Sequence, residues 1–223
     1  MQVKDLMTKV VKVVTTNQSL LEIRELMLNN NLRRIPVVDG DGYLKGIVTD
    51  GDVARATPSD ASTLDRYEVN YILGKLKAKD LMTKAVITVK AEDGVETAAY
   101  LMYKFKIGAL PVVDTSNKVV GIISDTDVFK AFVDLLGYAK TSTKITVDTQ
   151  DRVGVLADLA KIFKDRGVNI ISVLTRKIGP KRAAITVRAD LTNAMDIIIQ
   201  TIRDAGFVIT DISTLKVDDA HEK

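Results

Sequence analysis

The sequence contains no cysteine and no tryptophan, and its only histidine, His221, lies in a polar segment near the C-terminus. Without cysteine there is no disulfide, no thiolate metal site and no cysteine nucleophile. Histidine acid–base chemistry or zinc binding would depend entirely on that one residue. We therefore expect a protein that is not an enzyme, has no metal centre and requires no cofactor.

An excess of one charge and long apolar runs are also lacking. The chain carries 32 basic and 29 acidic residues, mixed along its length, for a formal net charge of +3. Such a balance predicts no surface for nucleic acid. No run of about 18 apolar residues occurs, and Met1–Leu20 interleaves charge with valine, so neither a spanning helix nor a signal peptide is expected. We expect a cytoplasmic protein that binds neither nucleic acid nor membrane.

What is present is the composition of a folded protein. Apolar residues make up 46% and charged residues 27% of the chain, values typical of soluble globular proteins. The chain has 223 residues, which is more than a domain with one small hydrophobic core needs, so two domains are expected. A polar tail, residues 218–223, is expected after them.

An internal repeat organises the first 135 residues, and it is offset by 75 positions. The recurring segments are Lys4–Lys9 (again at Lys79–Lys84), Pro36–Asp39 (Pro111–Asp114) and Gly46–Val53 (Gly121–Val128). From Lys4 to Val53 the alignment needs no gap, and 19 of 50 positions are identical. The first part of the chain is therefore a duplicated unit.

Each repeat predicts the order strand, helix, strand, strand, helix. In the first repeat, Val10–Thr15 is a short β-branched strand, and Ser19 with Glu22 forms a capping-box start for an amphipathic helix. Two strands, Ile35–Asp39 and Tyr43–Thr49, form a hairpin around a glycine-containing turn.

The segment between the repeats predicts a packed helix. We place its start at Thr57–Asp60 and its apolar face on residues at helical spacing. These residues are Leu64, Tyr67, Tyr71, Ile72 and Leu76.

The β-α-β-β-α unit, ending in Gly-apolar-apolar-Ser/Thr-x-x-Asp, resembles the CBS motif, a module that normally occurs in pairs. The resemblance implies motif 1 at residues 1–58, a helical linker at 59–77 and motif 2 at 78–138, packed as one CBS pair. Clefts between paired motifs commonly hold AMP, ADP, ATP, S-adenosylmethionine or related adenosyl ligands. The resemblance therefore implies an adenine nucleotide as a regulatory ligand.

The pairs Thr49/Asp52 and Ser124/Asp127 allow two interpretations. Ser/Thr-x-x-Asp at a helix start is an ordinary capping arrangement. In the functional interpretation the hydroxyl approaches ribose or phosphate and the carboxylate binds the ribose hydroxyls. The repetition inside two CBS-like units favours nucleotide binding at one cleft or both.

The resemblance implies further walls of the nucleotide site. They are Val11 and Val86 on the first strand of each motif, and Arg33, Arg34, Ile35, Pro36, Ile107, Leu110 and Pro111 before and at the two prolines. A plain core role is the alternative for the apolar residues. The arginines have Gly108 and Ala109 as counterparts, so motif 1 would neutralise phosphates where motif 2 offers room. A solvated surface or an intersubunit salt bridge is the alternative for the arginines.

From Thr143 onward the pattern changes to β-α-β-β-α-β, the ferredoxin-like split arrangement. The predicted elements are Lys144–Asp148, Val153–Arg166, Val168–Thr175, Ala183–Ala189, Asn193–Asp204 and Phe207–Leu215. Asp151–Leu156 and Gly167–Ile171 resemble the Asp-x-x-Gly-x-Leu and Gly-apolar-Asn-Ile segments of the ACT domain, here at residues 142–217. The fold class is therefore α+β, a CBS pair followed by a ferredoxin-like ACT domain.

The ACT resemblance implies an effector site at the turn before the first helix of that domain, for an amino acid or another small molecule. The residues carried over are Asp151, Val153, Gly154, Val155, Leu156, Asn169 and Ile170. Gly154 would let the chain approach the ligand closely. The alternative is that Gly154 only eases helix–sheet packing and that the domain serves to dimerise.

The whole chain resembles the acetoin utilisation (AcuB) group. This implies a ligand sensor, expected as a homodimer, in which adenosyl ligand and effector each favour one arrangement of protomers and regulate a partner enzyme. The alternative is an interaction module with empty sites.

Overall fold

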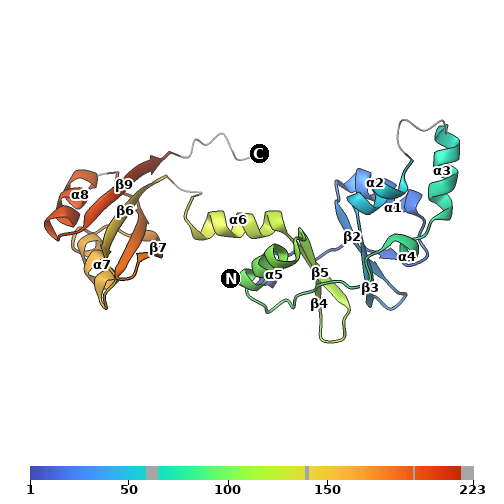
Figure 1. Cartoon of the computed structure of the whole chain (residues 1–223), viewed down its shortest axis with the longest axis horizontal. Helices are drawn as coiled ribbons and strands as arrows, with labels where there is room; N and C mark the ends of the chain where they lie inside the picture. Colours follow the sequence, from blue (N-terminus) through green and yellow to red (C-terminus); the bar gives the residue numbers. More distant parts are fainter. Residues whose placement is uncertain (59–64, 139–140, 193, 217–223) are drawn as a thin grey trace. The chain divides into compact units, whose positions relative to one another are not determined.

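The computed structural model describes residues 1–58, 65–138, 141–192 and 194–216, and the chain divides into two compact units, Met1–Phe129 and Lys130–Lys223 (Figure 1). The first unit contains most of both repeats, and the second contains the predicted ACT domain. Each described part mixes helices with strands, so the predicted α+β class is confirmed.

Motif 1 follows the predicted element order. Its elements are η1 (Val3–Asp5), β1 (Val14–Thr15), α1 (Leu20–Asn30), β2 (Arg34–Val38), β3 (Leu44–Thr49) and α2 (Asp50–Ala56). Strand β2 is central, parallel to β1 and antiparallel to β3. The capping box at α1 is confirmed, because the Glu22 N–H donates to Ser19 Oγ at 3.3 Å and the Ser19 N–H donates to the Glu22 carboxylate at 2.9 Å.

Motif 2 repeats this arrangement without a full first strand. Its elements are α4 (Ala78–Leu81), α5 (Val95–Phe105), β4 (Ala109–Val113), β5 (Val119–Ser124) and α6 (Asp125–Leu135). Strands β4 and β5 pair with the same register as β2 and β3.

The predicted strand Val10–Thr15 was too long. Thr8 exchanges backbone hydrogen bonds of 2.9 and 3.1 Å with Ile122 of motif 2, and the chain leaves that pairing before it joins β2. Only Val14 and Thr15 then form a ladder. Val11, and Val86 in motif 2, therefore lie before the strand position and not on it.

The two motifs contact each other reciprocally at the 75-residue offset. Thr83 exchanges bonds of 2.9 and 3.0 Å with Ile47, the counterpart of the Thr8–Ile122 pairing. A Cβ on Gly46 would lie 2.8 Å from Met82 Cγ, and one on Gly121 would lie 3.1 Å from Met7 Cγ. Each motif therefore supplies the methionine that covers a glycine of the other.

The linker helix α3 (Arg66–Lys75) begins at Asp65, which caps it by accepting from the N–H groups of Tyr67 and Glu68 at 2.8 Å. The predicted start at Thr57–Asp60 was wrong at Thr57, whose hydroxyl donates to the Val53 carbonyl at 2.7 Å and closes α2. Residues 59–64, including Leu64 of the predicted apolar face, lie outside the described residues.

The apolar face predicted for the linker was confirmed at Leu76 but wrong at its two tyrosines. Tyr67 is 84% and Tyr71 64% exposed, whereas Leu73 is fully buried and Val69 and Leu76 pack beside it. The buried stripe is therefore shifted around the helix, and the tyrosines face solvent.

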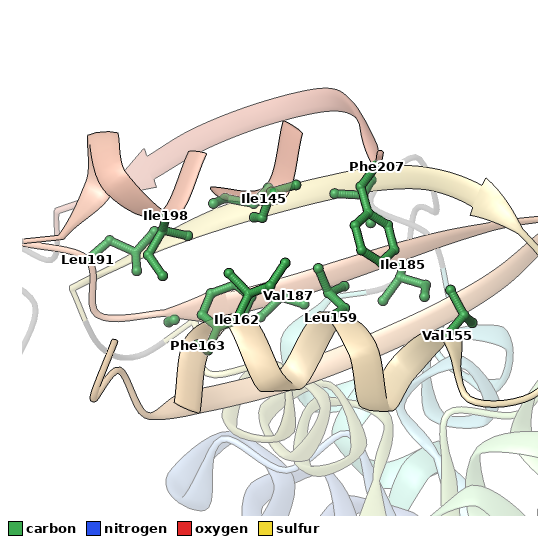
Figure 2. Close-up of a cluster of buried hydrophobic side chains, with 13 residues drawn as sticks. Ile145, Val155, Leu159, Ile162, Phe163, Ile185, Val187, Leu191, Ile198 and Phe207 are labelled. Carbon is green, nitrogen blue, oxygen red and sulfur yellow. The ribbon is translucent and has the colours of Figure 1, made fainter. Parts of the chain in front are cut away.

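The second unit has the predicted β-α-β-β-α-β order. Its elements are β6 (Ser142–Gln150), α7 (Val155–Asp165), β7 (Ile170–Gly179), β8 (Arg182–Ala189), α8 (Met195–Asp204) and β9 (Val208–Leu215). The sheet order is β7-β8-β6-β9, with every neighbouring pair antiparallel. Figure 2 shows Leu159, Ile162 and Phe163 of α7 against strand residues such as Ile185 and Val187, which form the core.

The boundary between the units falls inside α6, ahead of residue 138, because the end of that segment packs on the second unit. The Ser172 hydroxyl donates to the Leu136 carbonyl at 2.9 Å, and the Arg188 guanidinium lies 5.1 Å from the centre of the Tyr138 ring. Arg188 is only 8% exposed and also donates to Ser142 Oγ at 3.1 Å. Ser172 and the buried Arg188 thus hold Leu136–Tyr138 against the sheet.

Replacing Arg188 by alanine is expected to lower the free energy of unfolding of the second unit by about 1–2 kcal/mol, through loss of the cation–π contact and the hydrogen bond. Urea unfolding followed by circular dichroism measures this. Arg176→Ala, an exposed arginine on the neighbouring strand β7, is the control and should change little. Equal stability of both variants would contradict the structural role of Arg188.

Candidate functional site

A pocket of about 270 Å³ lies within the first unit and is lined by both motifs. Motif 1 contributes the facing ends of β2 and β3, and motif 2 contributes the segment after α4 and the one between α5 and β4. The lining residues are Arg34, Ile47, Thr49, Asp50, Thr83, Ala85, Val86, Ile87, Lys106, Ile107, Gly108 and Ala109. We call it the inter-motif pocket.

Backbone hydrogen bonds set the walls of this pocket. Arg34 and Thr49 are register partners on β2 and β3, so both lie at the same end of the hairpin. The Asp125 N–H donates to the Gly108 carbonyl at 3.0 Å, which fixes the motif 2 segment, and the Thr83–Ile47 pairing joins the two sides. The strand and helix ends of each motif therefore place the lining residues.

One side of the inter-motif pocket is apolar. Val86, Ile87 and Ile107 are partly exposed in the pocket, together with Ile47 from β3. The structure thus brings four of the predicted site residues together, namely Arg34, Thr49, Val86 and Ile107. The sequence missed Lys106 and Asp50, although each directly adjoins a predicted segment.

The Thr49/Asp52 pair has capping-box geometry. The Asp52 N–H donates to Thr49 Oγ1 at 3.2 Å, and Asp52 Oδ2 accepts from the Thr49 N–H at 2.8 Å and from its hydroxyl at 2.7 Å. Arg55 forms an ion pair with the other oxygen, Oδ1. The Asp52 carboxylate is 8% exposed, so it faces its own helix start.

Ser19 and Glu22 form the same contacts at the start of α1, outside the inter-motif pocket. Hydrogen bonds from the backbone and side chain of Ser19 hold the pKa of Glu22 below its ordinary value. The geometry of a Ser/Thr-x-x-acid pair therefore does not by itself distinguish a cap from a ligand site.

The second pair, Ser124/Asp127, differs in one respect. Asp127 Oδ2 accepts from the Ser124 N–H at 2.8 Å and from its hydroxyl at 2.7 Å, as in motif 1. Lys130 replaces Arg55 at this point of the repeat, and among the described residues nothing donates to Asp127 Oδ1. This carboxylate thus retains a free acceptor oxygen.

The prediction that motif 2 offers room instead of charge was wrong for the inter-motif pocket. A Cβ on Gly108 would collide with Arg34 Nη2 and lie 2.9 Å from Arg34 Cζ. The space left by Gly108 is therefore filled by the guanidinium of motif 1.

The remaining predicted nucleotide residues lie elsewhere. Ile35 and Leu110 are fully buried, and Pro36 and Pro111 are buried beside them. These four residues therefore have the core role that was the alternative to ligand binding. Val11 is partly buried, and Ser124 caps the start of α6.

Arg33 lines a larger concavity of about 730 Å³ formed by α1, α2 and the segment between α1 and β2. That concavity has walls from motif 1 alone and reaches Pro58, next to residues that are not described. We therefore base the candidate site on the inter-motif pocket. Within residues 1–58, 65–138, 141–192 and 194–216, no three His, Asp or Glu side chains form a metal-binding group.

In the second unit, the predicted effector residues surround the start of α7. Gly154 has a φ of +85° and precedes α7 without a side-chain cap, and nothing lies within 4 Å of the position of its Cβ. The left-handed backbone therefore favours glycine at this position, and the space beside it is not filled by other described residues. Asp151 forms an ion pair of 3.6 Å with Lys177.

The other effector residues differ in exposure. Val153 is fully exposed and Leu156 is 42% exposed, whereas Val155 is buried in the core. Asn169 is exposed, and Ile170 begins β7 half-buried.

Family models match both parts of the chain. The model of the CBS domain matches residues 3–59 and 78–134, which is half of the chain, and the model of the ACT domain matches residues 143–197. No helix in the described part of the chain is long and apolar enough to cross a membrane.

Curated relatives match over part of their length. A homoserine O-acetyltransferase from Methanocorpusculum labreanum is 39% identical over 124 residues, 56% of this chain and 23% of the relative. An L-aspartate semialdehyde sulfurtransferase from Methanocaldococcus jannaschii is 31% identical over 130 residues, 58% of this chain and 23% of the relative. The match thus spans less than a quarter of each of these proteins.

Two solved structures align with a similar share of the chain. The CBS domain pair of protein MJ0100, in complex with 5′-methylthioadenosine and S-adenosyl-L-methionine, has a TM-score of 0.50 and 30% identity over 59% of this chain and 99% of that chain. A Vibrio cholerae structure assigned as an acetoin utilization protein (AcuB) has a TM-score of 0.51 and 29% identity over 61% and 93%. The chain belongs to the CBS domain family, as a tandem CBS pair followed by an ACT domain, and is similar to the AcuB group.

Proposed function

We propose that the CBS pair binds an adenosyl ligand, such as AMP, ADP, ATP or S-adenosylmethionine, in the inter-motif pocket, and that the chain is a regulatory sensor. One observation carries the proposal: a single pocket collects Thr49 of motif 1 with Val86 and Ile107 of motif 2. The CBS pair of MJ0100, which aligns with this chain, is described in complex with two adenosyl ligands.

The chemistry of the pocket suits an adenosyl group. The apolar side formed by Val86, Ile87 and Ile107 offers van der Waals contact to the flat adenine ring. Thr49 ends β3 and lines the pocket, and Asp52 follows it in the first turn of α2; there a ribose hydroxyl would replace Arg55 at Asp52 Oδ1. This ion pair joins the largely exposed Arg55 to the buried Asp52, so a ribose hydroxyl that replaces Arg55 must itself donate to the carboxylate oxygen that is left. Isothermal titration with AMP, ATP, 5′-methylthioadenosine and S-adenosylmethionine tests the proposal, and no heat of binding from any of them would refute it.

Replacing Asp52 or Asp127 by asparagine is expected to weaken binding of the titrated ligand about tenfold at the affected cleft. The loss corresponds to one charge-assisted hydrogen bond to a ribose hydroxyl, while the amide keeps the shape of the side chain. Calorimetry on each variant measures the change.

Glu22→Gln is the matched control, because it alters the same kind of capping box on α1, outside the inter-motif pocket. Ligand affinity should be unchanged in that variant. If Asp52→Asn and Asp127→Asn also bind as tightly as the unmodified protein, both carboxylates act only as caps.

For the ACT domain we propose a small effector, such as an amino acid, at the turn Asp151–Leu156. The helix α7 has no side-chain cap at its N-terminus. The Val155 N–H donates to the Arg152 carbonyl at 3.3 Å, so the next amides of the first turn would receive a carboxylate. A thermal-shift panel of the amino acids tests this, with Asn169→Ala as the variant that should lose the response. We further propose a homodimer that regulates a partner enzyme and does not catalyse a reaction itself. Native mass spectrometry and incubation with ATP test these proposals separately.

An interaction module with empty sites is the alternative function. The capping contacts of Asp52, including its ion pair with Arg55, favour it, because they satisfy the carboxylate without a ligand. Saturation at 100 times the dissociation constant adds about 2.7 kcal/mol to the stability of a binding protein. An unchanged melting temperature at millimolar adenosyl ligand would support the alternative.

A further inference from the structure

The inter-motif pocket holds an arginine that crosses from one motif to the other. From it we infer that this pocket selects adenine nucleotides that carry a phosphate over uncharged or sulfonium adenosyl compounds, and that Arg34 is the residue that determines this specificity. The inference rests on the proposed function, since it concerns which adenosyl ligand the same pocket prefers.

The position of Arg34 depends on Gly108. The guanidinium occupies the place where any side chain at residue 108 would begin, and Asp125 Oδ2 lies 2.7 Å from the same point. Arg34 starts on β2 of motif 1 but reaches the pocket wall of motif 2. Because residue 108 is a glycine, the guanidinium of Arg34 from motif 1 can lie against the motif 2 side of the pocket.

The charges that line the pocket are unequal. Arg34 and Lys106 are positive and Asp50 is acidic among the lining residues, and the Asp125 carboxylate lies at the Gly108 wall near Arg34. Among the described residues, no carboxylate lies within 4.0 Å of the charged groups of Arg34 or Lys106, whereas seven other cations form such pairs. Among the rings that the structure describes, Lys106 contacts only that of Tyr103, at 6.0 Å. In the described part of the chain neither cation therefore forms an ion pair within 4.0 Å, although the Asp125 carboxylate lies near the Arg34 guanidinium.

Lys106 is held at the pocket by its backbone. It ends α5 with a φ of +57°, a left-handed conformation that is uncommon for a lysine. Its counterpart in motif 1 is Asn31, a residue type that adopts this conformation more readily. The helix end therefore places a positive side chain beside the apolar wall made by Ile107.

A phosphate complements these two groups. A guanidinium donates two parallel hydrogen bonds to phosphate oxygens, and an ammonium adds a point charge. An uncharged 5′-thioether gains nothing from them, and a sulfonium is repelled. The CBS pair of MJ0100 is described with a thioether and a sulfonium ligand, so the inferred preference differs from the ligands of that similar protein.

The experiment is calorimetric titration of the full chain with AMP, adenosine and 5′-methylthioadenosine, for the unmodified protein and for Arg34→Gln. We expect AMP to bind at least about tenfold more tightly than adenosine, and Arg34→Gln to abolish most of this difference while adenosine affinity stays the same. The AMP advantage should also shrink as salt is raised. Retained adenosine binding shows that the variant is folded.

Lys79→Gln is the matched control, since it removes one positive charge from an exposed position outside the pocket and should leave the AMP preference intact. Gly108→Ala should lower AMP affinity with Arg34 still present, because the added Cβ displaces the guanidinium. Equal affinity for AMP and adenosine, or an AMP preference unaffected by Arg34→Gln, would overturn the inference and leave the proposed function standing. Absence of binding by all three compounds would instead remove the proposed function itself.

Discussion

Replacing Phe163 by alanine is expected to lower the free energy of unfolding of the ACT domain by about 3–5 kcal/mol, the usual cost of removing a buried aromatic ring. Phe163 is 1% exposed and lies between α7 and the sheet, among the side chains shown in Figure 2. A cavity at this place removes contacts to both layers at once. For a domain of ordinary stability, this loss removes a large share of the free energy of unfolding.

The measurement is urea unfolding followed by far-ultraviolet circular dichroism, together with calorimetric titration of the CBS ligand. Because the chain divides into two compact units, the ACT transition should move to lower urea while the CBS transition and ligand affinity stay unchanged. Val153→Ala is the control, since Val153 is fully exposed at the start of the same helix. Simultaneous loss of both transitions in Phe163→Ala would show that the two units fold as one.

The repeat made most of the architecture predictable from the sequence. A shared offset of 75 positions set the order of elements in both motifs, and amphipathic spacing located α1, α5 and the helices of the ACT domain to within a few residues. The reciprocal contacts of the motifs were not predictable in the same way. Met7 and Met82 stand in polar surroundings in the sequence, and nothing there indicates that each covers a glycine of the other motif.

The linker helix shows where a periodic pattern misleads. Tyr67 and Tyr71 have the spacing of an apolar face, but Leu73 is the residue that is buried in the core. Tyrosine is amphipathic and is stable at a surface, so its spacing carries less information than that of leucine. Here Lys75 lies 4.3 Å from the centre of the Tyr71 ring, which gives the exposed aromatic group a contact.

The candidate site was predictable as a set of segments but not as a geometry. Thr49, Val86 and Ile107 line one pocket. Two features depended on side-chain conformation: the ion pair of Arg55 with Asp52 and the path of Arg34 into the space at Gly108. A long side chain can contact several sides of a pocket, and the sequence does not specify which of them it contacts.

Replacing Gly46 by valine is expected to destabilise the CBS pair by about 2–3 kcal/mol, the cost of overpacking a close contact. The ideal Cβ position at residue 46 lies 2.5 Å from Met82 Sδ, 2.8 Å from its Cγ and 3.0 Å from its Cβ. The stem of Met82 is therefore in the way and cannot simply swing aside. Thermal unfolding of the full chain measures the effect on the CBS transition.

The equivalent change in motif 2 should cost less, since the Cβ of residue 121 would meet Met7 at Sδ and, at 3.1 and 3.3 Å, at Cγ and Cε, nearer the flexible end of the side chain. Gly40→Val is the control, because nothing lies within 4 Å of that Cβ position. In a Met82→Ala background the cost of Gly46→Val should fall by at least about 1 kcal/mol, which measures the coupling between the motifs directly. If the costs simply add, the two motifs do not interlock through this pair, and backbone bonds such as Thr8–Ile122, Thr83–Ile47 and Leu44–Asn117 join them instead.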